Sequence, residues 1–165
     1  MPATWSEALA AQAASDLAAY EFLSSSSLPS SHRLHYLQMW LEKLCKAYLW
    51  KPHSVELELR VRHNVIAKVL PRLIAEHWRR IGFANSPDLS DIRSLCREID
   101  LLHPQVDDGE RRLDNVEYPW RGKSGSPEIP AQWGFPIASR LYTPSGRLLL
   151  KAADRLTRDR SMLLG

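Results

Sequence analysis

The sequence predicts an all-α protein, an up-down helical bundle of four to five helices with a long aromatic-containing loop before the last helix. Apolar residues recur at steps of three and four over several stretches, which is the pattern of one face of a helix. The first linker is short, which favours antiparallel neighbouring helices. A chain of 165 residues is long enough for one domain with a substantial core.

The first predicted helix begins near Trp5 and ends within Ser24–Ser27. Thr4 is placed to cap it, and Glu7 follows three residues later, as in a capping box. The serines favour a helix end because their hydroxyl groups compete for backbone hydrogen bonds.

The second predicted helix, Arg33–Trp50, is central to the bundle. Ser30 or Ser31 is the expected N-cap. Glu42 is spaced to pair with Lys46 one turn later. The apolar stripe consists of Leu34, Leu37, Leu41, Leu44 and Tyr48. Trp40, Cys45 and Leu49 widen this stripe, so we expect the helix to be covered on more than one side.

The third predicted helix begins near Arg62–Asn64 and ends at Gly82, a residue suited to a helix C-cap. Pro71 lies inside it and is expected to kink the helix or to split it, because proline lacks the backbone N–H group. The expected apolar face consists of Val65, Ile66, Val69, Leu70, Leu73, Ile74, Trp78 and Ile81.

Two further helices complete the predicted bundle. One begins at Asn85–Asp88 and is closed by Pro104. The last begins at Thr143–Ser145 and covers roughly residues 145–160. The inward residues of the former are Leu89, Ile92, Leu95, Cys96, Ile99 and Leu102, and those of the latter include Leu148, Leu149, Ala152, Leu156 and Met162.

Residues 104–136 lack helical periodicity and are rich in proline, glycine and charge. Loops of about 30 residues are uncommon in compact domains and are often functional when ordered. Tyr118, Trp120 and Trp133 either fasten this loop to the core or bind a partner, since tyrosine and tryptophan are favoured interface anchors. We therefore expect a single domain over residues 1–165, with a core at roughly 3–103 and a wrapping loop at 104–136.

Charge and cysteine content narrow the functional classes. The net charge is +3, and basic segments at 51–80 and 121–165 flank an acidic one at 81–120. These segments either neutralise one another or present a basic surface to phosphate. Cys45 and Cys96 lie in apolar helical patterns, which indicates core thiols in a reducing cytoplasm. No apolar run approaches a membrane span, and no secretion signal is expected.

The central helix resembles the second helix of HEPN domains, a family of small all-helical domains. Its segment Gln38–Leu49, QMWLEKLCKAYL, matches the family's pattern of Gln, Glu-Lys, Lys-Ala and Leu. Asp16-Leu17 and His63-Asn64 resemble the family's Asp-Leu and His-Asp. Glu117-Tyr118-Pro119 resembles its Arg-Tyr-Pro, with Glu in place of Arg. The similarity covers roughly residues 12–120 in the family's order.

The resemblance implies a homodimer or a partner protein, such as a nucleotidyltransferase, and a role in a toxin–antitoxin or defence system. Some family members are metal-independent ribonucleases that carry an Arg, then about four to six residues, then a His. Arg72 and His77 fit this spacing, although active members place a polar residue where Leu73 stands. In the alternative interpretation, Arg72 is a surface charge and His77 is partly buried near Trp78.

Two functional hypotheses remain from the sequence. The first is a non-catalytic binding module for a partner protein, nucleotide or RNA. The second is an endoribonuclease in which His77 is the general acid or base and Arg72 stabilises the phosphorane. Four arginines would bind the RNA backbone: Arg60, Arg62, Arg79 and Arg80. No cofactor or metal is expected, because His32 and His35 lack a further ligand at suitable spacing.

Overall fold

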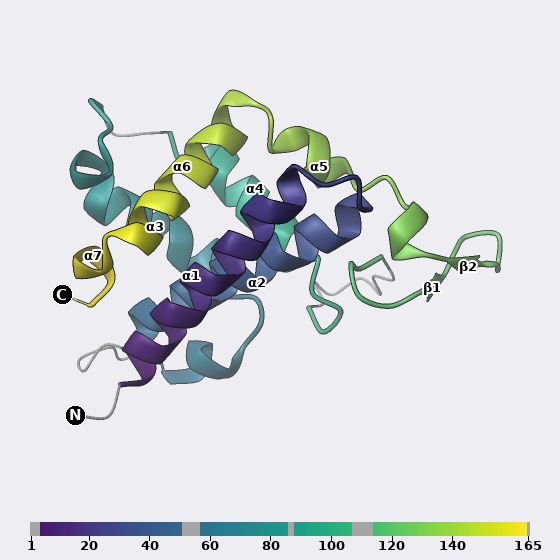
Figure 1. Ribbon diagram of the computed structural model, residues 1–165, viewed down its shortest axis with the longest axis horizontal. Coiled ribbons are helices and arrows are strands. Elements are labelled where there is room, and N and C mark those ends of the chain that lie inside the picture. Colours follow the sequence, from purple (N-terminus) through teal and green to yellow (C-terminus); the bar gives the residue numbers. More distant parts are fainter. Residues whose placement is uncertain (1–3, 51–56, 86–87, 107–113, 165) are drawn as a thin grey trace.

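The computed structural model describes residues 4–50, 57–85, 88–106 and 114–164 and is predominantly α-helical (Figure 1). The fold class predicted from the sequence is confirmed. None of the helices in these ranges combines the length and apolar character needed to span a membrane. The α-helices are α1 Trp5–Ser24, α2 Ser30–Leu49, α3 Ile66–Ile81, α4 Ser90–Asp100, α5 Pro136–Arg140, α6 Pro144–Arg158 and α7 Arg160–Leu164. Two 3₁₀ helices, η1 Leu57–Val61 and η2 Pro130–Gln132, and a two-stranded sheet of β1 Trp120–Arg121 and β2 Pro127–Glu128 complete the structure.

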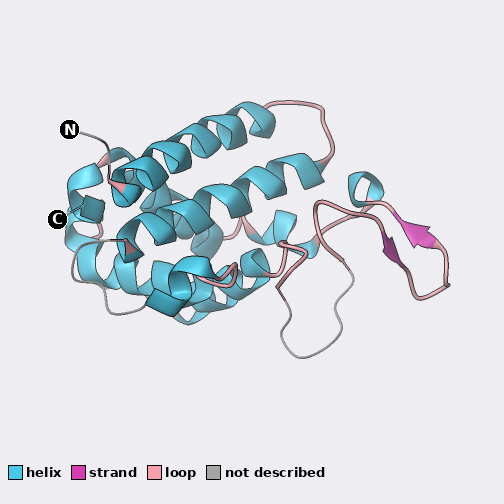
Figure 2. Ribbon diagram, turned by 90° about the horizontal axis from the view of Figure 1, so that it is seen from below, coloured by secondary structure: helices cyan, strands magenta, loops and turns pink. Residues whose placement is uncertain are grey.

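Helices α1 and α2 form an antiparallel hairpin, in which α1 lies along the outside of the bundle and α2 lies in its interior (Figures 1 and 2). The predicted capping box is present, because the Thr4 hydroxyl accepts a hydrogen bond from the Glu7 N–H and the Glu7 carboxylate accepts one from the Thr4 N–H. The predicted serine cap on α2 is wrong. Pro29 is the N-cap and makes no side-chain cap, while Ser31 lies inside the helix and is buried.

Helix α3 begins two residues after the predicted Arg62–Asn64 region because a cap from another helix determines its start. Asp100, at the end of α4, accepts hydrogen bonds from the N–H groups of Ile66 and Ala67. The prediction that Pro71 could split the helix is wrong, since α3 is continuous through Pro71, whose ring is buried. Gly82 ends the helix with φ of 95°, as predicted.

Helices α4 and α6 cover the remaining sides of α2 and α3. Helix α4 begins at Ser90, later than predicted, and the Asp88 carboxylate accepts a hydrogen bond from the Ser90 N–H. The predicted last helix corresponds to α6, which is capped as expected by Thr143, whose hydroxyl accepts a hydrogen bond from the Gly146 N–H. It ends at Arg158, and α7 follows it. The predicted inward residues of these helices are buried except Leu89 and Leu148, which are partly exposed.

Hydrogen bonds inside the core join helices that are distant in sequence. The Trp40 indole N–H donates to the Thr157 hydroxyl at 2.8 Å, so α2 and α6 are joined at a buried point. The Ser6 hydroxyl donates to the carbonyl of Ala47 and joins α1 to α2. Cys45 and Cys96 are buried free thiols, and burial raises the pKa of both.

Candidate functional site

An aromatic arm, defined here as residues 118–135, extends beyond the helical body (Figures 1 and 2). Its strands β1 and β2 pair antiparallel, with Trp120 opposite Glu128. The turn between them favours glycine at Gly125, whose φ is positive, and a second glycine at 122 leaves room for the flexible Glu128 side chain. Gly125 has φ of +85°, and a Cβ at Gly122 would lie 2.5 Å from a Glu128 carboxylate oxygen. The local glycines therefore permit a tight hairpin where the sequence suggested only an irregular loop.

The base of the aromatic arm is fastened to the core by aromatic rings in edge-on and tilted contact. The Trp120 indole lies 5.5 Å from the Trp133 ring in an edge-on arrangement and 6.4 Å from the Phe135 ring. Phe135 is buried in the bundle, so this row of rings connects the arm to the hydrophobic core. At the other end of the arm, Glu117 pairs with His35 of α2 at 3.6 Å. The arm is therefore held at both of its attachments.

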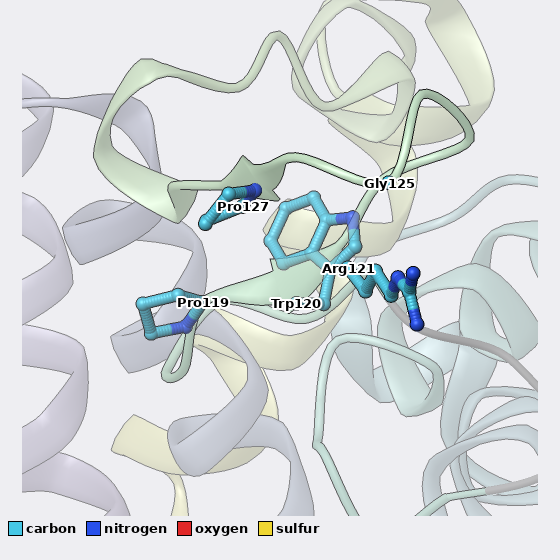
Figure 3. A pocket seen from close by; sticks show the side chains of 5 residues that line it. All are labelled: Pro119, Trp120, Arg121, Gly125 and Pro127. Atoms are coloured by element: carbon cyan, nitrogen blue, oxygen red, sulfur yellow. The ribbon is translucent and has the colours of Figure 1, made fainter.

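The outer side of the aromatic arm presents apolar side chains to solvent. Tyr118 is 62% exposed, Ile129 is 42% exposed and Trp133 is 38% exposed. The sequence selected Tyr118, Trp120 and Trp133 as partner-binding residues; in the structure Trp120 and Trp133 contact each other, and Tyr118 is exposed at the start of the arm. The sequence missed Ile129, whose position beside Pro130 in a polar loop was the available signal. A small pocket of about 200 Å³ is lined by Pro119, Trp120, Arg121, Gly125 and Pro127 (Figure 3).

Arg72 and His77, the predicted catalytic pair, occupy one helix but face different neighbours. The Arg72 guanidinium lies 5.6 Å from the centroid of the Tyr48 ring, and the Tyr48 hydroxyl donates to the Glu76 carboxylate. His77 is partly buried beside a shallow hollow of about 250 Å³, which Arg79 and Arg80 also line. A separation of five residues turns a helix by about 140°. The two side chains therefore point in different directions within one copy of the chain.

The four arginines predicted to bind RNA fall into two pairs at opposite ends of α3. Arg60 and Arg62 precede the helix, whereas Arg79 and Arg80 lie in its last turn. The 16 residues of α3 span about 24 Å. Each arginine already contacts another group of the protein. Arg60 lies over Trp50 at 4.5 Å, Arg62 is 3.8 Å from Glu58, Arg79 lies over Trp78 at 5.0 Å, and Arg80 contacts Ser161 and Asp159.

A second group of polar side chains, which we call the Glu42 cluster, consists of Gln38, Glu42, Lys46, His63 and His103. Glu42 is buried in α2. One of its carboxylate oxygens accepts hydrogen bonds from Lys46 at 2.7 Å and from His63 Nδ1 at 3.1 Å, and the other accepts one from Gln38 at 2.6 Å. The imidazole rings of His63 and His103 stack with centroids 3.9 Å apart. Three segments distant in sequence thus meet at one carboxylate.

The hydrogen bonds determine which nitrogen of each histidine carries a proton. Because a carboxylate only accepts hydrogen bonds, His63 Nδ1 must be the donor to Glu42. His103 Nδ1 accepts from the N–H of Gln105 at 3.1 Å, so the neutral ring carries its proton on Nε2. Burial lowers the pKa of His103, and the neighbouring His63 lowers it further. His103 therefore favours its neutral form.

Several polar residues that carry the family resemblance lie in two groups of hydrogen bonds and ion pairs on α2. Gln38, Glu42, Lys46 and His63 belong to the Glu42 cluster. The next residue of α2, Lys43, forms a separate ion pair with Asp16 of α1 at 2.5 Å. These polar residues therefore join α1, α2 and the segment before α3, which gives their spacing a structural cause. The sequence predicted the Glu42–Lys46 pair but not its two histidine neighbours.

No protein-family model matches this chain, and no curated protein or solved structure shows significant similarity to it.

Proposed function

We propose that this chain is a helical binding module that docks a partner protein through the aromatic arm. The observation that carries the proposal is the contrast between the packed rings at the base of the arm and its exposed apolar side chains. Its base is fastened by the row of Trp133, Trp120 and Phe135, while Tyr118 and Ile129 remain exposed. Rigid, exposed aromatic side chains contribute large contact areas at a small cost in conformational entropy.

The chemistry of the arm favours a protein over RNA as the partner. Its exposed side chains include the large apolar groups of Tyr118, Ile129 and Trp133, beside the charged groups of Arg121 and Lys123. The small pocket beside Trp120 is lined by two prolines and the indole, which suit an apolar side chain of the partner, and also by Arg121 and Gly125 (Figure 3). Aromatic anchors that fill pockets dominate the binding energy of many interfaces.

The resemblance to HEPN domains supports the same proposal. It implies a homodimer or a nucleotidyltransferase-type partner, and a role in a toxin–antitoxin or defence system. The buried free thiols of Cys45 and Cys96 support activity in a reducing compartment such as the cytoplasm.

A quantitative co-purification experiment tests the proposed surface. The affinity-tagged full chain is expressed in its native cells beside a Tyr118→Ser, Ile129→Ser variant, because these side chains are exposed and their replacement leaves the base of the arm intact. Val61→Ser is the matched control, since Val61 is 78% exposed in η1, which lies beside the C-terminal end of α2 rather than in the arm. A partner retained by the natural chain and the control but lost by the arm variant supports the proposal. A partner retained equally by all three proteins refutes it.

The second candidate is a metal-independent endoribonuclease that uses Arg72 and His77 across a dimer. One observation favours it: His77 borders a solvent-accessible hollow together with Arg79 and Arg80, which could bind phosphate. The test incubates RNA with the purified chain in a chelator, beside an Arg72→Ala, His77→Ala variant. Cleavage by the natural chain alone supports the ribonuclease. Equal cleavage by both proteins, or cleavage by neither, rejects this assignment for the purified chain.

A further inference from the structure

We propose that Glu42, His63 and His103 form a binding site for a divalent transition-metal ion such as Zn²⁺. The three side chains come from α2, from the segment before α3 and from the segment after α4. One potential ligand atom from each lies within 4.8 Å of the others, and no second such group occurs among the described residues. This inference is independent of the aromatic arm and of the proposed partner.

The donor atoms match the chemistry of zinc and its neighbours in the transition series. Imidazole nitrogen and carboxylate oxygen are standard ligands for these ions, and three protein ligands leave a coordination position open for water or another ligand. Two metal–ligand bonds of about 2.0–2.2 Å span at most about 4.4 Å. Three ligands bound tetrahedrally to one ion at such distances lie about 3.5 Å from one another. The observed limit of 4.8 Å therefore requires the ligand atoms to approach one another by about an ångström, through side-chain rotation.

At the proposed site the Glu42 carboxylate is oriented by a hydrogen bond, and the His63 side is accessible to solvent. Glu42 is 6% exposed, and Gln38 donates to the carboxylate oxygen that faces away from His63. Such hydrogen bonds from neighbouring residues orient metal ligands. The side chain of His63 is 35% exposed, so an ion has a route from solvent to the site.

Lys46 and His63 both donate hydrogen bonds to Oε1 of Glu42, the oxygen through which we expect the ion to bind. Lys46 Nζ lies 2.7 Å from it and His63 Nδ1 lies 3.1 Å from it. On binding, the ion replaces the proton of His63 Nδ1, and the proton leaves to solvent. The Lys46 ammonium group then moves away, because it and the ion repel each other. Its long, flexible side chain allows that movement.

One imidazole ring must also turn. The rings of His63 and His103 are stacked with an angle of 11° between their planes. A metal ion lies near the plane of each ring that binds it, so two parallel rings cannot both bind one ion. His103 can turn only by releasing the hydrogen bond that its Nδ1 accepts from the Gln105 N–H. Metal binding is therefore expected to change the environment of the Gln105 amide.

The experiment titrates the full chain with Zn²⁺ against a chromogenic chelator and with Co²⁺, whose visible absorption reports its coordination number. We expect one ion per chain and an affinity that falls by roughly tenfold or more in the His63→Ala and His103→Ala variants. His32→Ala is the matched control, because His32 is an exposed histidine outside the group. Lys46→Met is expected to raise the affinity, since it removes the competing cation.

The effect of Lys46→Met on metal affinity distinguishes a metal site from a purely structural ion-pair network. At a metal site this variant binds the ion more tightly, whereas the histidine variants bind it more weakly. In such a network, Lys46→Met would lower stability without improving metal binding. Absence of one-to-one binding, equal affinity in the His103→Ala variant, or no gain in the Lys46→Met variant would each overturn the proposal. If a histidine variant fails to fold, the NMR chemical shift of the Gln105 amide in the natural chain decides between the two outcomes. A change in this shift on Zn²⁺ addition supports the site, and an unchanged shift refutes it.

Discussion

The carboxyl group of Asp100 is expected to make the stability of the fold depend on pH. It is buried at the end of α4 and accepts hydrogen bonds of 3.0 and 2.9 Å from the N–H groups of Ile66 and Ala67. Burial raises its pKa to about 7, although these two hydrogen bonds oppose the rise. The Asp100→Asn substitution keeps an acceptor oxygen of similar shape but removes the titrating group.

The sign of the effect follows from the protons bound in each state. In the unfolded chain the Asp100 carboxyl has its ordinary pKa of 3.8, against about 7 in the fold. From about pH 4 to about pH 7 the folded state binds more protons, so the free energy of unfolding falls as pH rises. Each pKa unit is worth about 1.4 kcal/mol. The loss between about pH 5 and about pH 7 is therefore roughly 2 kcal/mol.

Urea unfolding of the natural chain and the Asp100→Asn variant, at several pH values between about 5 and 7.5, measures this effect. The difference in unfolding free energy between the two proteins isolates Asp100 from the other titrating groups. We expect the advantage of the natural chain to shrink by roughly 2 kcal/mol over this range. An advantage that grows with pH would refute the reasoning, because it would mean that the carboxylate is stabilised in its charged form at the start of α3.

Three substitutions test the packing and capping described above. Thr157→Val removes the acceptor of the buried Trp40 indole N–H, so urea unfolding should show a loss of about 1–3 kcal/mol; an unchanged stability would contradict the isolation of this bond from water. Gly146→Ala places a Cβ 2.3 Å from the Arg140 carbonyl oxygen, and thermal unfolding should show a loss of about 1–3 kcal/mol. An unshifted melting curve would mean that α5 and α6 separate easily. Thr4→Ala should cost about 1 kcal/mol and speed hydrogen exchange in the first turn of α1, and unaltered exchange would argue against the capping box.

The sequence predicted elements whose determinants are local. The apolar stripe of α2 required only helical spacing, and all four of its leucines are fully buried. The capping box at Thr4 and the glycine at the end of α3 depend on neighbouring residues alone. For the same reason the Glu42–Lys46 ion pair could be predicted, because both residues lie on one face of one helix.

The features that the sequence did not predict depend on contacts between distant segments. The start of α3 is capped by Asp100, which lies 34 residues after Ile66. The loss of one backbone hydrogen bond at Pro71 is tolerated where the ring is buried among other core residues. His63 and His103 meet only because α3 and α4 pack together. No periodic pattern in the chain contains that information.

The same distinction applies to the candidate sites. Tyr118, Trp120 and Trp133 stood out because aromatic side chains are unusual in a polar, proline-rich segment, and the structure brings them together in the arm. The choice of Arg72 and His77 rested on spacing alone, which cannot show what each side chain faces. Their arrangement across two copies of the chain stays a prediction.

The hydrogen bond between Trp40 and Thr157 has a consequence for biosynthesis. Ribosomes add about 5–20 residues per second, so the 117 residues that separate the two partners take roughly 6–23 s to make. Throughout that interval α2 has been synthesised but α6 does not yet exist to cover the Trp40 side of it. The nascent chain therefore presents an unfinished apolar surface to the cell, and chaperones that act during translation have several seconds in which to bind it.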